Sequence, residues 1–394
     1  MVNANLTKAK KAKNDEFYTQ YQDIEKEMNA YLEYNPNVFK NKTILCPCDD
    51  PEWSNFTKYF AQNFEKFKLK KLISTSFAVE SKGYKGGYKV TIFERKNPKF
   101  DENKTKVKGK NFTLAKDKTG DNRIDIDDLD YKYLEGDGDF RSDEVIKLRD
   151  EADIIITNPP FSLFREFIGW IMEGKKEFLI IGNLNAITYK EVFPLIKENR
   201  IWLGNNCKVN GGAMFFEIPE DIANLNQVRE INTDKNGKKI YVTRVQGVRW
   251  FTNLDHGRRH NPIPLMTEIE VIKFVKKKPF NKYDNYDAIE VALVKNIPRD
   301  YNGVMGVPIS IMDKYSPEQF EILGTSDNGL IDDKFKKTLG LTKEFVDDYY
   351  SAGGTGAYKE GNPTAGCYED GVAKMVYKRI FIRHKKIKSK KDTK

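Results

Sequence analysis

Short apolar segments alternate with amphipathic segments in the first half of the chain, and this alternation restricts the fold more than any other feature. Residues 42–48 (KTILCPC) and 71–76 (KLISTS) have the composition of buried strands. Residues 55–67 between them carry apolar side chains at helical spacing, so the three segments predict a parallel β-α-β unit. A second strand, helix and strand follow at 153–157, 163–173 and 177–182. The sequence therefore predicts an α/β fold built on a parallel sheet.

Other segments complete the expected organisation. An acid-rich segment, 14–34, has apolar residues at helical spacing and predicts a helix. Residues 80–135 are rich in Lys, Gly and Asp, which predicts a polar insertion with a hairpin of its own at about 88–95. Later apolar segments at 213–218 and 245–253 predict strands.

The length of 394 residues is enough for two domains, each with its own core. We expect a division near Asp255, which gives residues 1–255 and 256–394. The formal charge is +9, from 67 Lys and Arg against 58 Asp and Glu, and residues 374–394 carry all of this excess. A basic end on a neutral body suits contacts with phosphate, although a solvated tail would have the same composition.

Composition argues against several classes of protein. Mean hydropathy is −0.65, and no apolar run approaches the roughly 20 residues that a membrane span needs. The first 13 residues are polar and basic with no apolar segment behind them, so no secretory signal is predicted. Four cysteines without a C-x-x-C pair predict neither a disulfide framework nor a zinc site. We expect a monomeric, cytoplasmic protein with no membrane partner and no metal.

The residues that point to chemistry form one tetrapeptide, Asn158-Pro159-Pro160-Phe161, directly behind the apolar strand at 153–157. In open α/β sheets ligands bind at the carboxyl ends of strands, where this loop is expected. The prolines fix the backbone and lack N–H donors, so Asn158 and the neighbouring carbonyls form a rigid set of acceptors. Such a site suits a planar amine that donates two hydrogen bonds while its ring stacks on Phe161. An ordinary strand-ending turn uses the same dipeptides and stays open as an alternative.

Six blocks of sequence, which include this tetrapeptide, resemble the EcoRI-type adenine-specific DNA methyltransferases. They are DEFYTQYQDIEKEM (15–28), ILCPCDDPEWSNF (44–56), GDGDFRSDE (136–144), TNPPFSLFREFI (157–168), FLIIGNLNAI (178–187) and FEILG (320–324). The resemblance implies a Rossmann-like sheet that binds S-adenosylmethionine, followed by a C-terminal target-recognition region. It also implies methyl transfer to N6 of an adenine flipped out of double-stranded DNA, in restriction–modification. A cognate restriction endonuclease that acts separately, in a bacterial or phage-infected cell, follows from the same resemblance.

The resemblance further assigns residues to the cofactor. The candidate cofactor-binding residues are Phe17, Tyr18, Thr19, Pro47, Asp49, Asp50, Asp139, Phe140 and Asn158. Asp49 and Asp50 stand where a glycine-rich loop is usual in this fold, and a helix N-cap would explain them as well. Asp139 is expected to accept from the adenine amine of the cofactor while Phe140 packs on its ring, with an Asx turn as the alternative. No acid that could bind a ribose follows the strand at 71–76.

The region from about residue 256 onward is the candidate for reading the DNA sequence. The candidate DNA-contacting residues are Arg258, Arg259, Lys276, Lys277, Lys378, Arg379 and Arg383. Their side chains suit phosphate or guanine, and a solvated loop is the alternative for the pair at 258–259. The bases that are read do not follow from the sequence.

Three other patterns are weaker. Cys48 lies in a Pro-Cys dipeptide like the nucleophile of cytosine methyltransferases, but a buried small side chain is the favoured interpretation. Residues 117–128 (DKTGDNRIDIDD) fit a calcium loop only in part, because Asn122 replaces the glycine of such loops. His256 and His260 lack a third metal ligand. Two other functions stay open: methylation of RNA bases or protein glutamine by the same tetrapeptide, and DNA binding without turnover.

Overall fold

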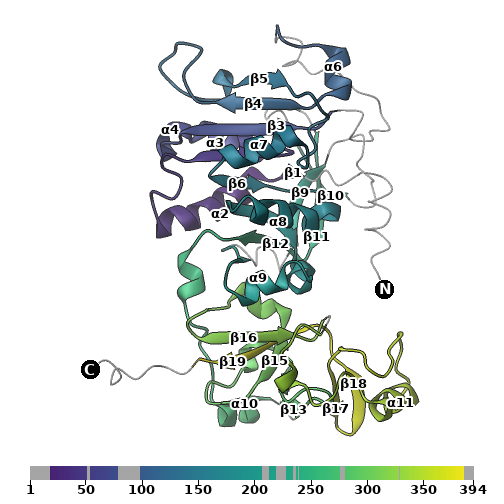
Figure 1. Ribbon diagram of the computed structural model, residues 1–394. Helices are drawn as coiled ribbons and strands as arrows, with labels where there is room; N and C mark the ends of the chain where they lie inside the picture. Colours follow the sequence, from purple (N-terminus) through teal and green to yellow (C-terminus); the bar gives the residue numbers. More distant parts are fainter. Residues whose placement is uncertain are drawn as a thin grey trace. The chain divides into compact units, whose positions relative to one another are not determined.

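The computed structural model describes residues 18–50, 54–78, 98–205, 213–218, 228–233, 237, 239–275, 280–327 and 329–385. The chain forms two compact units (Figure 1). Unit 1 comprises Met1–Asn183 and Leu203–His256, and unit 2 comprises Leu184–Trp202 and Gly257–Lys394. A single boundary near Asp255 therefore does not account for Leu184–Trp202, which belongs to the second unit.

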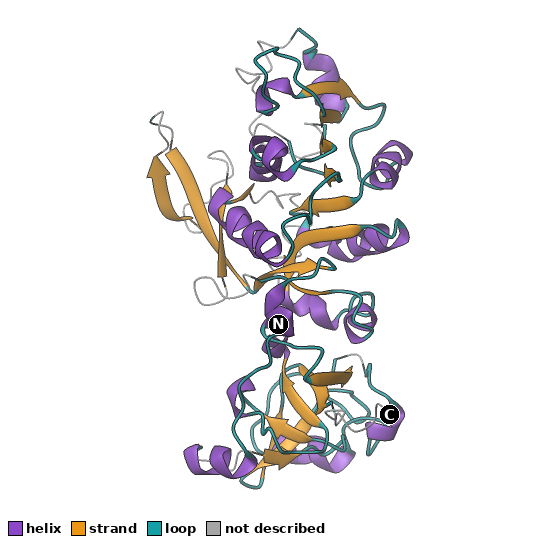
Figure 2. Ribbon diagram, turned by 90° about the vertical axis from the view of Figure 1, so that its left-hand side faces the viewer, coloured by secondary structure: helices purple, strands orange, loops and turns teal. Residues whose placement is uncertain are grey.

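The centre of unit 1 is an eight-stranded sheet with the order β5-β4-β3-β2-β6-β7-β12-β8. Four neighbouring strands run parallel, namely β3 (Lys71–Ser76), β2 (Thr43–Cys46), β6 (Ile154–Thr157) and β7 (Glu177–Asn183). Their side chains are buried almost without interruption, because helices lie on both faces of the sheet (Figure 2). The parallel α/β sheet predicted from the sequence is confirmed.

The strand order reverses between β2 and β6. From β2 the chain crosses to β3 on one side, and β6 is added later on the other side of β2. The carboxyl ends of β2 and β6 therefore flank a topological switch point, which is where ligands bind in open α/β sheets. The loop after β2 and the tetrapeptide after β6 both lie at this edge.

The helices of unit 1 follow the strands in chain order. They are α2 (Tyr21–Tyr34), α3 (Asn55–Gln62), α4 (Phe64–Phe67), α6 (Glu102–Val107), α7 (Asp143–Glu151) and α8 (Phe164–Glu173). Ser54 caps α3, because its hydroxyl accepts a hydrogen bond from Phe56 N at 3.1 Å. The helix expected over 55–67 is interrupted at Asn63, which has non-helical angles (φ −106°, ψ 12°).

Two strands of the central sheet come from the segment expected to be a polar insertion. β4 (Lys110–Leu114) pairs antiparallel with β3, and β5 (Asp130–Tyr133) pairs antiparallel with β4. Part of 80–135 thus extends the central sheet, which the expectation of a separate insertion did not include. The hairpin expected at 88–95 lies outside the described residues.

A second, four-stranded sheet of unit 1 has the order β1-β9-β11-β10. Its strands are β1 (Tyr18–Thr19), β9 (Ala213–Ile218), β11 (Lys239–Gln246) and β10 (Val228–Thr233). The strand predicted at 213–218 is confirmed as β9. The helix expected from residue 14 begins instead at Tyr21, because residues 18 and 19 pair with β9 as a short strand.

The strand expected at 245–253 is two strands that belong to different sheets. β11 belongs to the second sheet and ends at Gln246. β12 (Val248–Thr252) belongs to the central sheet, where it pairs antiparallel with β7. Gly247 between them has φ 71°, a conformation that favours glycine. β8 (Trp202–Leu203) then lies next to β12.

Unit 2 is built on a five-stranded sheet with the order β13-β14-β15-β19-β16. Its strands are β13 (Phe280–Lys282), β14 (Ile289–Val291), β15 (Met305–Pro308), β19 (Arg379–His384) and β16 (Phe320–Thr325). The hairpin β17 (Gly366–Glu369) and β18 (Val372–Met375), with α9 (Phe193–Lys197), α10 (Glu268–Phe274) and α11 (Lys343–Ser351), completes the unit. Within the basic C-terminal segment, Arg379–His384 thus form strand β19, which pairs on both sides. Across the described part of the chain, no helix is both long and apolar enough to cross a membrane.

Candidate active site

The tetrapeptide 158–161 lies at the switch point and is held from both ends. Pro159 is buried and Asn158 is half-buried. The carbonyl of Pro160 accepts a hydrogen bond from Leu163 N at 2.9 Å, which starts the short helix η3 (Phe161–Leu163) and then α8. The ring of Phe161 packs on the main core of unit 1 and meets Phe216 edge-on, with the two centroids 6.4 Å apart. Asn158 therefore stands on a backbone that is fixed by two prolines and by a helix start.

Thr157, the last residue of β6, ties this loop to the loop after β2. Its hydroxyl lies 2.8 Å from the Pro47 carbonyl and also contacts Asp49 Oδ2. The hydroxyl of Ser54 donates to Asp49 Oδ1 at 2.7 Å. Asp49 is 6% exposed, and this burial raises its pKa to about 7 even though the bonds from Thr157 and Ser54 lower it. Its carboxyl group therefore joins the two strand ends that flank the switch point.

The number of hydrogens available for hydrogen bonds around Thr157 favours a neutral Asp49. The hydroxyl of Thr157 has a single hydrogen, yet it contacts both the Pro47 carbonyl and Asp49 Oδ2, two oxygens that would each accept it. An ionised Asp49 would have to share this one hydrogen with the Pro47 carbonyl, whereas a protonated Asp49 would donate its own hydrogen to the Thr157 oxygen and leave the Thr157 hydrogen for Pro47. Because the pKa of Asp49 is raised to about 7, this protonated form is populated below neutral pH.

The loop after β2 keeps its shape without the usual glycines. Cys48 has φ 64°, the left-handed conformation that a glycine-rich loop would supply. The end of β3 holds it there: Thr75 Oγ1 accepts from Cys48 N at 3.2 Å, and the Thr75 carbonyl accepts from Asp49 N at 2.7 Å. Ser74 Oγ donates to the Asp49 carbonyl. Residues 74–76 (Ser-Thr-Ser), which include no acid that could bind a ribose, thus hold the loop after β2 in its conformation.

Thr19 brings the N-terminal block to the same edge. It pairs with Phe216 across β1 and β9, and its carbonyl accepts from Asn55 Nδ2 at 2.8 Å at the start of α3. The Thr19 hydroxyl is buried and has no hydrogen-bond partner among the described residues. For Tyr18 only the backbone is described, and Phe17 lies outside the described residues.

Asp139 and Phe140 follow β5, in a loop that packs on the end of β3. Ala78 N donates to the Asp137 carbonyl at 2.7 Å, which joins this loop to the segment after β3. Arg141 binds both carboxylate oxygens of Asp139, at 2.9 Å from Nε and 2.6 Å from Nη2, and these hydrogen bonds lower the Asp139 pKa. The ring of Phe140 is fully buried against Phe167 and Trp170. The sequence did not single out Arg141, although it belongs to the GDGDFRSDE block.

The candidate DNA contacts in the first loop of unit 2 differ in their surroundings. Arg258 is half-buried in the short helix η6 (Gly257–His260). The guanidinium of Arg259 stacks on Trp202, 3.5 Å from the ring centroid, and donates to Asn199 Oδ1. Arg259 is only 8% exposed, so the structure gives it an internal role. Lys276 and Lys277 lie outside the described residues.

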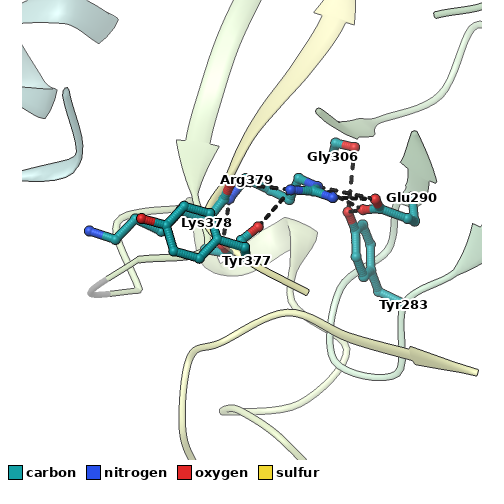
Figure 3. Close-up of polar contacts among 7 residues, drawn as sticks. Tyr283, Glu290, Gly306, Tyr377, Lys378 and Arg379 are labelled. Atoms are coloured by element: carbon teal, nitrogen blue, oxygen red, sulfur yellow. Dashed lines mark hydrogen bonds and ion pairs between the residues drawn. The ribbon is translucent and has the colours of Figure 1, made fainter. Parts of the chain in front are cut away.

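The candidate contacts near β19 have acidic neighbours. Lys378 Nζ lies 2.6 Å from Asp327 Oδ2, and Arg383 Nη2 lies 2.7 Å from Glu321 Oε2. Arg379 forms a buried ion pair with Glu290 (Figure 3), with Nη2 2.6 Å from Oε1. Tyr283 donates to the same carboxylate, and Arg379 Nη1 donates to the Tyr377 carbonyl at 2.7 Å. Arg379 therefore links β19 to β14 inside unit 2.

Replacing Arg379 by methionine is expected to destabilise unit 2 by about 3 kcal/mol, because Glu290 would remain buried without its cation. The matched variant Arg383→Met removes an ion pair between exposed side chains and is expected to cost less than about 1 kcal/mol. Urea unfolding of both variants measures the difference. Equal costs would contradict the internal role of Arg379.

The weaker patterns have local partners. Asp117 accepts from Gly120 N and Asn122 N, and Asp128 accepts from Lys118 N and Thr119 N, so these carboxylates bind the backbone of their own loop. The ring of His256 contacts the Leu203 carbonyl, and His260 pairs with Glu318. Among the described residues, no group of three or more His, Cys, Asp or Glu side chains could hold a metal.

Comparisons with known proteins agree with one another. Residues 5–385 match the family model described as "Adenine-specific methyltransferase EcoRI". The chain is 43% identical to Type II methyltransferase M.EcoRI of Escherichia coli over 322 residues, which is 82% of this chain and 89% of that protein. It is 37% identical to Type II methyltransferase M.MgeORF184P of Mycoplasma genitalium, over 81% of this chain and 85% of that protein. The identity to Type II methyltransferase M.MpnI of Mycoplasma pneumoniae is 35%, over 81% and 84% of the two chains. No solved structure matches the chain.

Proposed function

We propose, from the premise that this chain belongs to the family of EcoRI-type adenine-specific methyltransferases, that residues 158–161 form its catalytic centre. The chain is a site-specific DNA methyltransferase of restriction–modification that acts on adenine. The observation that carries the proposal is the place of Asn158-Pro159-Pro160-Phe161 at the switch point of the sheet. Double-stranded DNA is its substrate.

Asn158 and the Pro159 carbonyl are the acceptors for the target amine. Each accepts one N–H of the adenine N6 amino group, which draws both hydrogens away from the nitrogen lone pair and directs that pair outward. The face of Phe161 stacks on the adenine ring, and Phe216 supports Phe161 from its edge. The adenine must leave the duplex to reach this pocket, at a cost of a few kcal/mol of stacking. Catalysis then depends on orientation and electrostatics.

The residues around the switch point fit S-adenosylmethionine, the methyl donor that the family implies. The buried Thr19 hydroxyl, which has no partner among the described residues, is a polar group that a ligand would satisfy. When bound, S-adenosylmethionine supplies an activated methyl group. The residues proposed to hold it are Phe17, Tyr18, Thr19, Pro47, Asp49, Asp50, Asp139, Phe140 and Asn158. The side chains of Asp49 and Phe140 are buried in contacts with other residues, so their proposed role is to support the wall of the cofactor site.

Unit 1 is proposed as the catalytic domain and unit 2 as the target-recognition region. Phosphate contacts are proposed for Arg258, Lys276, Lys277, Lys378 and Arg383, while Arg259 and Arg379 support the unit from inside. A monomer is proposed to act in the cytoplasm of a bacterial or phage-infected cell. A cognate restriction endonuclease acts separately on the same sequence.

Methylation of DNA in vitro tests the proposal. Purified protein is incubated with methyl-labelled S-adenosylmethionine and unmethylated bacterial DNA, and the nucleosides are then separated by mass spectrometry. We expect N6-methyladenine as the modified base, and mapping the modified positions gives the recognition sequence. Label in RNA or protein, with none in DNA, would contradict the proposed substrate.

A further inference from the structure

Asn111, a buried residue at the carboxyl edge of the central sheet, has a side-chain oxygen with no hydrogen-bond partner among the described residues. It is the second residue of β4, which lies between β3 and β5 (Figure 1), and it is 5% exposed. A buried carbonyl oxygen without a donor costs free energy. A ligand with a hydroxyl or N–H group at this position would therefore find an acceptor already in place.

The start of β4 lies beside the strand that shapes the loop after β2. β4 runs antiparallel to β3, so Asn111 is directly opposite Thr75, the residue before the last of β3. Residues directly opposite each other in a ladder lie on the same face of the sheet. The hydroxyl of Thr75 accepts from Cys48 N at 3.2 Å, in the loop that carries Asp49. Asn111 is therefore a close neighbour of the residue that holds this loop.

The loop that carries Asp139 and Phe140 approaches Asn111 from the other side. β5 runs antiparallel to β4, so the loop that follows β5 begins at the same edge of the sheet. Gly109, two residues before Asn111, donates to the Gly136 carbonyl at 2.9 Å. A Cβ atom at Gly109 would lie 2.7 Å from Gly138 Cα, so only glycine permits this close approach. The amide of Asn111 thus lies between two loops that are proposed to hold the cofactor.

The two loops are proposed to hold different parts of S-adenosylmethionine. Asp49 and Asp50 belong to the loop after β2, and Asp139 in the other loop is expected to accept from the adenine amine. The ribose connects the adenine to the amino-acid part of the cofactor, so a group between the two loops is placed to meet the ribose. Dinucleotide-binding folds commonly bind a ribose hydroxyl with an acid, and residues 74–76 include none. An amide oxygen accepts from a hydroxyl as a carboxylate does.

We propose that Asn111 binds a ribose hydroxyl of S-adenosylmethionine through its Oδ1 atom, in the role that an acid after β3 would otherwise have. The inference rests on the proposed function, because that function requires this cofactor. The ribose hydroxyl supplies the donor that the buried oxygen lacks among the described residues. The Asn111 amide should therefore contribute to cofactor affinity and add nothing to the stability of the cofactor-free protein.

Titration calorimetry with S-adenosylhomocysteine, in the absence of DNA, tests the inference. Asn111→Ala is expected to lower the affinity about five- to ten-fold, as for the loss of one hydrogen bond between uncharged groups. Thr113→Val is the matched control, because Thr113 lies on the same face of β4 two residues further from the edge, opposite Ile73. We expect this variant to bind with the affinity of the wild type.

Asn111→Leu distinguishes a contact with the cofactor from a structural role. Leucine has nearly the shape of asparagine and replaces the buried oxygen by an apolar group. The cofactor-free variant should therefore unfold at a urea concentration no lower than the wild type does. Its affinity for S-adenosylhomocysteine should fall at least as far as that of Asn111→Ala, and it provides the binding measurement if the alanine variant fails to fold.

Analogues of S-adenosylhomocysteine identify the group that Asn111 binds. The wild type should bind the 2′-deoxy or the 3′-deoxy analogue about five- to ten-fold less tightly than the parent compound. Asn111→Ala should bind that analogue and the parent compound alike. S-inosylhomocysteine, which has an oxygen in place of the adenine amine, should lose the same factor in affinity with the wild type and with the variant.

The outcomes separate this inference from the proposed function. A wild-type protein that neither binds S-adenosylhomocysteine nor methylates DNA overturns the proposed function, and the role of Asn111 with it. A wild-type protein that does both, beside Asn111 variants of equal affinity, overturns the role of Asn111 alone. Variants that still discriminate against both deoxy analogues as the wild type does also overturn it. If they instead lose discrimination against S-inosylhomocysteine, Asn111 binds the adenine and the ribose assignment is wrong.

Discussion

Replacing Asn158 by alanine is expected to lower the rate of methyl transfer about 10²–10³-fold, with little change in the affinity for DNA. The side chain offers one of two acceptors to the target amine, and it is rigidly held between Thr157 and two prolines. Loss of one preorganised polar group at a reacting centre typically costs this much in kcat, or about 3–4 kcal/mol of barrier. Single-turnover transfer of labelled methyl to a duplex with one target site measures it.

Two other variants make this result specific. Asn158→Asp keeps an oxygen acceptor at the same place, and we expect it to retain more activity than the alanine variant. Asn37→Ala removes an exposed asparagine in the turn before β2, at the other edge of the sheet, and should methylate at the wild-type rate. An Asn158→Ala enzyme that works within ten-fold of wild type would show that the amine is held by other groups.

The parallel part of the fold could be predicted because its strands are continuous apolar runs. β2, β3, β6 and β7 lie within about two residues of their expected bounds, since strands buried on both faces leave a strong compositional signal. β4 and β5 were not expected, because their short sequences, KNFTL and DYKY, mix polar with apolar residues and their burial comes from neighbours. The two-residue β1 exists only by pairing with Glu217 and Phe216, about 200 positions away.

The residues of the candidate site also differ in whether the sequence could predict their roles. The tetrapeptide carries its signal in four adjacent residues, so its place behind a strand could be predicted. The contact of Thr157 with Asp49 spans 108 positions, and neither residue type alone indicates it. The partners of Arg259 and Arg379 are also distant in sequence, 57 and 89 positions away in Trp202 and Glu290, so their internal roles could not be read from local charge.

The pH dependence of stability should report the buried carboxyl of Asp49. Its pKa is about 3.8 when unfolded and about 7 when folded, because burial disfavours the charged form. The folded protein therefore retains a proton that the unfolded chain loses between these values. Asp49 contributes most stability below pH 4, and the contribution is lost as the pH rises to about 7. A shift of about three units corresponds to about 4 kcal/mol at most.

Asp49→Asn isolates this effect, because an amide of the same shape does not titrate and can donate to the Thr157 oxygen as a protonated Asp49 does. Urea unfolding at intervals from pH 5 to 8 should show the wild type losing about 2 kcal/mol relative to the variant between pH 5 and 7, and little further loss above. Asp347→Asn, at an exposed position of α11, should follow the wild type at every pH. If the wild type and Asp49→Asn kept a constant difference across this range, Asp49 would be ionised in the folded protein throughout. The single Thr157 hydrogen would then serve both the Pro47 carbonyl and Asp49, and the link between the two strand ends would depend on the negative charge of Asp49.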